Sequence, residues 1–197
     1  MAEASADRGR TTRQRLLGAA AALIAEVGWG GVSTRMVAER AGVTPGVVHY
    51  HFASLPDLLI AASTGVARAM LEELTGRLAE QPDPGTGVEW LLGELSRYTG
   101  TDPASLLIVE IDLAAARLPE LHDRLHEIVA DSRTQIASWL RDRGHSGDTE
   151  ATTAVLVAAV DGLVLHRGLD PGLDLTALAG PLRAMVRTDG HEEGSAT

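Results

Sequence analysis

Two histidines four residues apart, His122 and His126, form the pair whose type and spacing come closest to metal chemistry. Residues at i and i+4 share one face of a helix, so both imidazoles could bind the same Zn²⁺ ion. The neighbouring Asp123 and Glu127 lie about a quarter-turn round the helix, and no third ligand is evident. We therefore interpret the pair as part of a solvated polar face and predict no metal site and no cofactor.

The sequence carries no recognisable catalytic motif. It lacks a nucleophile elbow, a glycine-rich phosphate loop and a zinc-binding HExxH segment. The absence of cysteine also excludes disulfides and thiolate metal ligands. We predict that the protein is not an enzyme.

Asp161 and His166 interrupt the otherwise apolar segment TEATTAVLVAAVDGLVLHR. A carboxylate buried in such a segment needs a partner within the fold, across a dimer or on a ligand. Large side chains on the surrounding helices could line a mostly apolar ligand pocket, although each could equally be plain core. The candidate pocket residues are Met70, Trp90, Tyr98, Ile108, Trp139 and Asp161.

The element with the most distinctive local pattern is Ser33–Phe52, STRMVAERAGVTPGVVHYHF. A first short helix is expected over Arg35–Ala41, and Gly42 suits the left-handed residue that follows a helix. Thr44 suits the N-cap of a second helix over Pro45–His51, with proline at its first position. Because two residues separate these helices, they must cross steeply. This is a helix-turn-helix, whose second helix can enter a DNA major groove.

Helical periodicity and proline-containing helix starts elsewhere predict an all-α fold of about nine helices. A long helix is expected to join the small N-terminal lobe to a larger body, giving domains over 10–70 and 71–190. Residues 1–10 and those past 189 are expected to be disordered, with Arg8 and Arg10 forming a DNA-contacting arm as the alternative. The helices predicted outside the motif cover 12–27, 55–80, 88–99, 103–117, 119–143, 149–167 and 175–187.

Charge is divided unevenly along the chain. Residues 1–53 hold six arginines and four acidic residues, whereas the remainder holds eleven arginines and twenty-three acidic residues. The acidic body should repel phosphates, so DNA contact is expected only in the N-terminal lobe. No run reaches the ~18 apolar residues of a membrane span and no signal peptide is evident, which predicts a cytoplasmic protein.

The apolar segment after residue 150 must be covered on every side. One face can pack on its own domain, while the other needs a further partner. We predict a homodimer in which this helix and the last one form a four-helix bundle with their twofold mates. A monomer that buries both helices within itself is the alternative. The predicted interface residues are Val155, Ala159, Leu163, Leu178 and Leu182.

Thr12–Leu59 resembles the DNA-binding domain of TetR-type (tetracycline-repressor-like) transcriptional regulators. The matching segments are TRQRLLGAAAALIAEVGWGGVSTRMVAERAGV, TPGVVHYHF and ASLPDLL. The rest of the chain fits the family's ligand-binding and dimerisation domain in helix order. The family commonly carries tyrosine where this chain has His49, and often lysine where it has Leu55. Two phosphate contacts of the family pattern are therefore expected to be lost.

The resemblance implies a DNA-binding role for nine residues of the motif. Those opening the first helix would contact phosphate or a guanine edge, and those leading the second would face base edges. The residues at the end of the second helix would reach bases or backbone. The nine are Thr34, Arg35, Thr44, Pro45, Gly46, Val47, His49, Tyr50 and His51.

The resemblance further implies a homodimeric repressor that binds a palindromic double-stranded operator. An unidentified, largely apolar small molecule would release it from DNA, and no membrane partner is expected. Two other readings stay open. One is a helical dimer that binds small molecules but no operator, and the other is an architectural DNA-binding protein without an effector.

Overall fold

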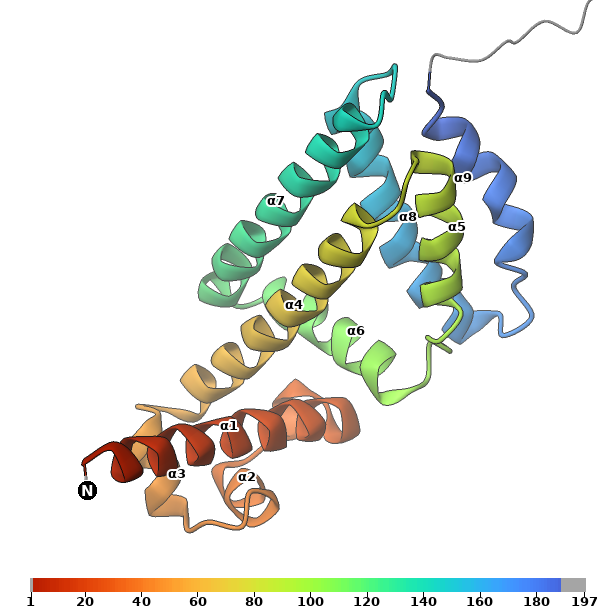
Figure 1. The fold of residues 1–197 in the computed structure, drawn as a ribbon. Helices are drawn as coiled ribbons and strands as arrows, with labels where there is room; N and C mark the ends of the chain where they lie inside the picture. The colour runs from red at the N-terminus through yellow and green to blue at the C-terminus, as the bar shows by residue number, and fades with distance from the viewer. Residues whose placement is uncertain (1, 189–197) are drawn as a thin grey trace, which may run out of the picture. The chain divides into compact units, whose positions relative to one another are not determined.

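The computed structural model of the protein describes residues 2–188, with side chains from Asp7 onward (Figure 1). Over these residues the fold is all-α, with nine α-helices, two short 3₁₀ helices and no strand beyond an isolated bridge between His145 and Thr188. In chain order the elements are α1 (Ala2–Val27), η1 (Trp29–Gly31), α2 (Thr34–Arg40), α3 (Pro45–His51), α4 (Leu55–Ala79), α5 (Pro84–Leu95), α6 (Pro103–Ala115), α7 (Pro119–Asp142), α8 (Thr149–Leu169), η2 (Thr176–Leu178) and α9 (Ala179–Met185).

The chain packs into two compact units, and α4 and α7 each run from one into the other. Of the described residues, unit 1 comprises 2–70 and 101–128, and unit 2 comprises 71–100 and 129–188. The predicted break at residue 70 coincides with the passage of α4 between the units, but α6 and the start of α7 belong to unit 1. Packing units and functional domains are different divisions, so the assignment of functions to 10–70 and 71–190 stays a prediction.

Unit 1 is built around a core that the helices of the N-terminal lobe share with α6. Buried side chains of α1, α2, α3 and α4 meet Leu107 and Ile111 of α6 in one apolar cluster. Trp29 is half-buried and packs against this cluster. A lobe of three short helices buries too little apolar surface to be robust alone, and α6 enlarges its core.

Unit 2 has its own core, to which α5, α7, α8 and the C-terminal segment contribute. Leu92, Trp139, Leu140 and Leu156 are among its buried residues. Figure 1 shows α5 running beside α9, in agreement with the packing of the two helices. Gly87 allows α5 to pack closely against α7, because a Cβ there would lie 2.4 Å from the Trp139 ring.

Three predicted elements were wrong at their boundaries. Helix α1 begins at Ala2 rather than near residue 12, so Arg8 and Arg10 lie on a helix and the first residues are not the loose segment predicted. Helix α5 begins at Pro84 rather than near residue 88, because Asp83 accepts a hydrogen bond from the Thr86 amide as an N-cap. The predicted disorder past 189 lies outside the described residues.

The last predicted helix also differs. Instead of one helix over 175–187, the chain forms η2 and then α9, with Gly180 and Pro181 in the first turn of α9. Proline is tolerated in a first turn because the amide it lacks would have no partner there. The proline therefore opens α9 and does not kink it.

Helix α8 corrects the expectation that no segment approaches a membrane span. An 18-residue window of Thr149–Leu169 has a mean hydropathy of 1.3, long and apolar enough to cross a bilayer. Such a composition is also that of a helix covered by protein, and by itself it is weak evidence for a membrane.

Candidate nucleic-acid interface

Helices α2 and α3 form the predicted helix-turn-helix. Ser33 caps α2 by accepting a hydrogen bond of 3.3 Å from the Met36 amide. Gly42 has a φ of +63°, the left-handed conformation expected of it, and the Arg15 guanidinium donates to the Ala41 carbonyl beside it. Thr44 occupies the N-cap position of α3, but its hydroxyl makes no capping hydrogen bond. That hydroxyl is exposed and available to a ligand.

Helix α3 has a buried and an exposed side. Val48 is 2 % exposed and Phe52, which caps the helix, 7 %, so these two residues hold the helix against the core. Tyr50, by contrast, is 85 % exposed and meets His51 edge-on with ring centroids 5.1 Å apart. A large aromatic side chain this exposed on a seven-residue helix contributes little to the fold.

All nine residues predicted to contact DNA remain accessible. Thr34, Val47 and His51 are half-buried. The exposed members are Arg35, Thr44, Pro45, Gly46, His49 and Tyr50. The fold thus brings the start of α2 and the leading end and outer face of α3 to the surface of unit 1. Their contact with DNA itself stays a prediction.

The arginines of the lobe differ in their partners. Arg40 forms a two-pronged ion pair with Glu26, at 2.8 and 2.6 Å, and the hydrogen bond from Arg40 lowers the pKa of the Glu26 carboxyl. Arg10 pairs with Asp7 on α1. Arg35 is exposed and has no ion pair with any described residue. Its guanidinium is therefore the one at the motif most open to a phosphate or a guanine edge.

The sequence pattern did not reveal one residue that supports the motif. The carboxylate of Glu110, on α6, accepts a hydrogen bond of 2.9 Å from the backbone amide of Trp29. Trp29 begins η1, the turn between α1 and α2, and follows Gly28 with its φ of +76°. Because the partners are 81 residues apart in sequence, no local pattern indicates the contact.

The six candidate effector residues do not come together in one place, and none lines the groove described below. Met70 and Ile108 belong to unit 1 and the other four to unit 2. Trp139 is core, with its indole Nε1 buried and without a hydrogen-bond partner among the described residues. Asp161 lies on the exposed side of α8 rather than buried, which corrects the prediction that it needs a partner. The effector site stays a prediction.

The predicted dimer residues fall into two groups. Leu163, Leu178 and Leu182 are half-buried against the core of unit 2, and Ala159 is also half-buried, whereas Val155 is 51 % exposed. Helix α8 also exposes apolar side chains on one side, at positions three or four residues apart except where the exposed Asp161 interrupts the series. The exposed apolar residues are Ala151, Val155, Ala158, Leu165 and Leu169.

The histidines on α7 lie side by side and exposed. The rings of His122 and His126 are 6.2 Å apart and nearly parallel, and the His122 imidazole is 3.2 Å from the Asp123 carboxylate. Within residues 2–188 no group of three or more His, Cys, Asp or Glu side chains could hold a metal ion.

Both halves of the chain match protein families, and several whole proteins are similar to it. Residues 16–62 match the bacterial regulatory proteins of the tetR family, and residues 82–189 match the tetracyclin repressor-like C-terminal domain. An HTH-type transcriptional regulator of Mycobacterium tuberculosis is 29% identical over 195 residues, covering 96% of this chain and 100% of that protein.

Solved structures agree with the fold. A transcriptional regulator of Streptomyces coelicolor A3(2) has a TM-score of 0.71 and 28% identity over 90% of this chain and 99% of its own. The transcriptional regulator FadR of Bacillus subtilis, in complex with stearoyl-CoA, has a TM-score of 0.69 at 18% identity, over 90% of this chain and 99% of its own.

The fold and the exposed helix-turn-helix define a DNA-binding transcriptional regulator. The chain belongs to the TetR family.

Proposed function

We propose that this protein is a homodimeric repressor that binds a palindromic operator through two copies of α3 and leaves it when a small molecule binds. Family membership supports this, because TetR-type regulators typically repress, bind ligands and form homodimers. They act on chromosomal DNA, which fits a cytoplasmic protein. The observation that carries the proposal is the contrast within α3 between buried Val48 and Phe52 and exposed Tyr50.

The leading end of α3 supports base contact. Thr44, Pro45 and Gly46 are exposed, and a Cβ at Gly46 would meet only the Thr44 hydroxyl, at 4.0 Å. The backbone there can therefore approach a base pair closely. Val47 adds an apolar contact suited to a thymine methyl group, and Arg35 adds a guanidinium. His49 and Leu55 replace two residues of the family pattern, so apolar contacts and Arg35 are expected to count for more.

Two observations support a second copy of the chain, namely the short reach of a single α3 and the exposed apolar side chains of α8. One seven-residue helix reads few base pairs, and a twofold pair reads two half-sites about 34 Å, one DNA turn, apart. The exposed apolar side chains of α8 support a dimer formed by α8 and α9. Effector release requires that the ligand bind the two arrangements of the reading heads with different affinities.

A gel-shift titration with the DNA upstream of the protein's own gene tests operator binding. We expect Arg35→Ala to weaken binding and to reduce the salt slope by about one unit, as for the loss of one phosphate contact. Tyr50→Phe removes only a hydroxyl and is expected to cost about 1 kcal/mol. Neither change should affect folding, because both side chains are exposed.

Arg97→Ala is the matched control, because Arg97 is 68 % exposed and lies in unit 2. It removes the same charge and should leave operator affinity unchanged. Absence of a shifted complex at moderate salt would overturn the proposal, as would insensitivity to both Arg35→Ala and Tyr50→Phe. Ligand affinity without an operator footprint would instead identify a small-molecule-binding helical dimer.

A further inference from the structure

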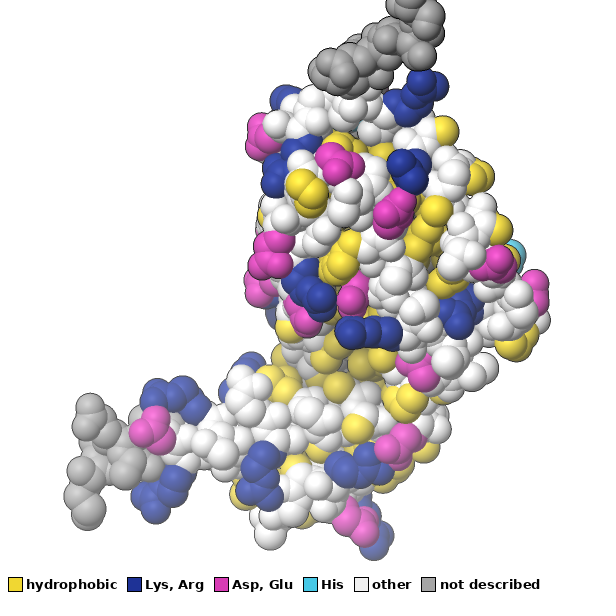
Figure 2. All heavy atoms as spheres, turned by 45° about the vertical axis from the view of Figure 1, so that its right-hand side comes forward, with side chains coloured by type: hydrophobic (Ala, Val, Ile, Leu, Met, Phe, Trp, Pro, Cys, Tyr) yellow, Lys and Arg dark blue, Asp and Glu magenta, His cyan; other side chains and the backbone are white. Residues whose placement is uncertain are grey.

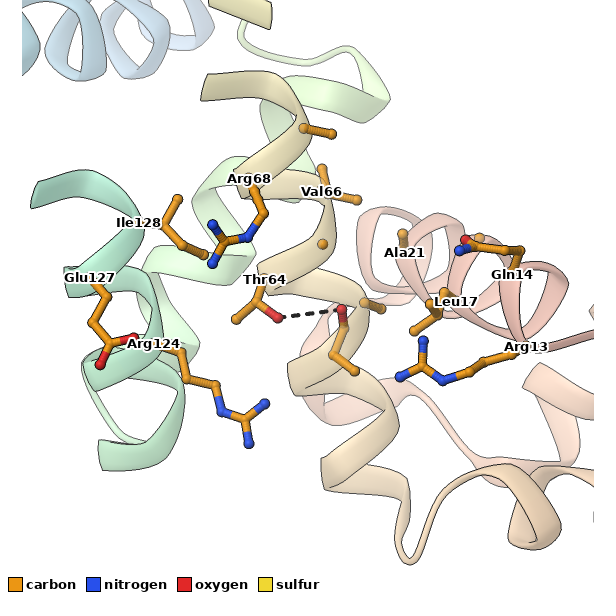
Figure 3. Close-up of a pocket in the computed structure, with 15 residues that line it drawn as sticks. Arg13, Gln14, Leu17, Ala21, Thr64, Val66, Arg68, Arg124, Glu127 and Ile128 are labelled. Atoms are coloured by element: carbon orange, nitrogen blue, oxygen red, sulfur yellow. Dashed lines mark hydrogen bonds between the residues drawn. The ribbon is translucent and has the colours of Figure 1, made fainter. Parts of the chain in front are cut away.

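Unit 1 contains a groove of about 800 Å³ between α1, α4 and the first part of α7 (Figure 3). This volume falls in the range of small-molecule sites. None of the six candidate effector residues lines it. Its lining residues are Arg13, Gln14, Leu17, Gly18, Ala21, Ala61, Ala62, Thr64, Gly65, Val66, Arg68, Ala69, Arg124, Glu127 and Ile128.

The groove is hollow because several of the residues of α1 and α4 that line it are small. A Cβ at Gly18 or at Gly65 would meet no atom within 4 Å, which leaves open space where larger residues would pack. Leu17, Val66 and Ile128 add apolar surface. The Thr64 hydroxyl is already bonded to the Ile60 carbonyl, at 2.8 Å. The floor therefore suits an apolar group.

The sides of the groove carry positive charge. Figure 3 shows the Arg13 side chain reaching from α1 toward α4, and Arg68 and Arg124 in the gap between α4 and α7. Arg13 stacks over the Phe52 ring at 5.0 Å, and Arg124 pairs with Glu120 at 2.7 Å. Arg68 has no hydrogen bond or ion pair with a described residue.

Glu127 is the one acidic residue among those that line the groove. With Arg124 paired to Glu120, the groove keeps an excess of positive charge centred on Arg13 and Arg68. A guanidinium binds a carboxylate or phosphate through charge-assisted hydrogen bonds, which are the strong ones. An apolar floor under an unpaired guanidinium is complementary to a molecule with an apolar body and an anionic head.

We infer that this groove is a binding site for a small amphipathic organic anion, an aliphatic carboxylate being the simplest such ligand. The head lies on Arg68, and the apolar body extends over Gly65 toward Gly18 and Arg13. The site is separate from the effector pocket proposed above, and its existence does not depend on operator binding.

Isothermal titration of the full-length protein with decanoate, in the absence of DNA, tests the site. We expect saturable binding with one decanoate per chain, and at least tenfold weaker binding of decanol and of acetate, which each lack half of the ligand. Arg68→Gln is expected to weaken decanoate binding about tenfold, as for the loss of one charge-assisted hydrogen bond. Gly65→Leu should abolish binding by filling the groove.

Two matched variants separate the site from general effects. Arg117→Gln removes an exposed arginine of the same unit that does not line the groove. Gly93→Leu fills open space on α5, where a Cβ also meets nothing within 4 Å. Both should bind decanoate as the unmodified protein does. The inference is overturned if decanoate does not bind saturably, if decanol binds equally well, or if Gly65→Leu retains full affinity.

Discussion

At Gly42 the chain turns from α2 into α3 with a φ of +63°, and a Cβ there would lie 3.0 Å from a guanidinium nitrogen of Arg15. The left-handed conformation costs a residue with a Cβ about 1–2 kcal/mol. Gly42→Ala is therefore expected to lower the free energy of unfolding by about that amount in a urea titration. Gly42→Asn should cost less, because asparagine tolerates this conformation better.

Gly65→Ala provides the comparison for that prediction. Gly65 lies within α4, where alanine is favoured over glycine by roughly 0.5–1 kcal/mol and the added Cβ meets no neighbour. The same substitution should thus stabilise the protein at residue 65 and destabilise it at residue 42. Equal effects at the two positions would contradict the role given to the turn.

Asp161 predicts a dependence of stability on pH. Partial desolvation raises the pKa of its carboxyl above the ordinary 3.8, and attraction to Arg133 only partly opposes this. The protonated form is therefore the one that the fold favours, and its contribution to stability is present below pH 3.8 and is lost as the pH rises through the folded pKa.

Asp161→Asn should accordingly raise the free energy of unfolding at neutral pH, by less than about 1 kcal/mol because solvent screens this exposed group. The gain should disappear below pH 3.8. Urea titrations at both pH values measure it, with Asp131→Asn, exposed on α7, as the control for removing one negative charge. A gain of the same size at both pH values would show that ionisation of Asp161 is not its cause.

At the scale of elements, Glu110 shows how α6 supports the segment before the helix-turn-helix. Glu110→Ala leaves the Trp29 amide without its acceptor, which should cost about 1–2 kcal/mol. Glu110→Gln keeps an acceptor oxygen and should recover part of this. Hydrogen exchange at the Trp29 amide is the direct measurement, and we expect faster exchange in the alanine variant.

Glu73→Ala, at an exposed position of α4, controls for the loss of a carboxylate. It should leave exchange at Trp29 unchanged. If Glu110→Ala also exchanged at the original rate, the contact between α6 and η1 would not be what holds this segment.

A polar N-cap residue followed directly by proline signals the start of a helix. Thr44–Pro45 and Asp102–Pro103 open α3 and α6 at the predicted residues. Asp83–Pro84 carries the same signal, but because glycines follow it, the helix was expected to start only at residue 88. The reason for Gly87 is the Trp139 ring, which no local pattern reveals. Local chemistry therefore predicts capped ends well, and tertiary contacts decide the exceptions.

The candidate site was predictable to a similar extent. The helix-turn-helix followed from Gly42 and from the Thr44–Pro45 helix start. The groove between α1, α4 and α7 could not be predicted, because it depends on the fold bringing Gly18 of α1 and Gly65 of α4 to the same groove. Its two sides are distant in sequence, and either glycine alone reads as a neutral helix position.

At the scale of the whole molecule, apolar and charged side chains are distributed unevenly over the surface of unit 2. In Figure 2, apolar side chains on the visible face of this unit lie among arginine and acidic side chains. Along α8, exposed apolar positions lie on either side of the exposed Asp161, and Leu169 is 82 % exposed. An apolar surface of this kind is one that a second copy of the chain is expected to cover.

Leu165→Arg tests this expectation, because Leu165 lies on this surface and is 49 % exposed. A charged group there would be desolvated in the dimer, so sedimentation equilibrium should show dissociation to a monomer at concentrations where the unmodified protein is dimeric. Leu113→Arg is the matched control, since Leu113 on α6 is 47 % exposed. A dimer that survives Leu165→Arg, or a monomeric unmodified protein, would exclude α8 as the interface. Because each half-site needs its own α3, loss of the dimer should also abolish operator binding, while decanoate binding in unit 1 persists.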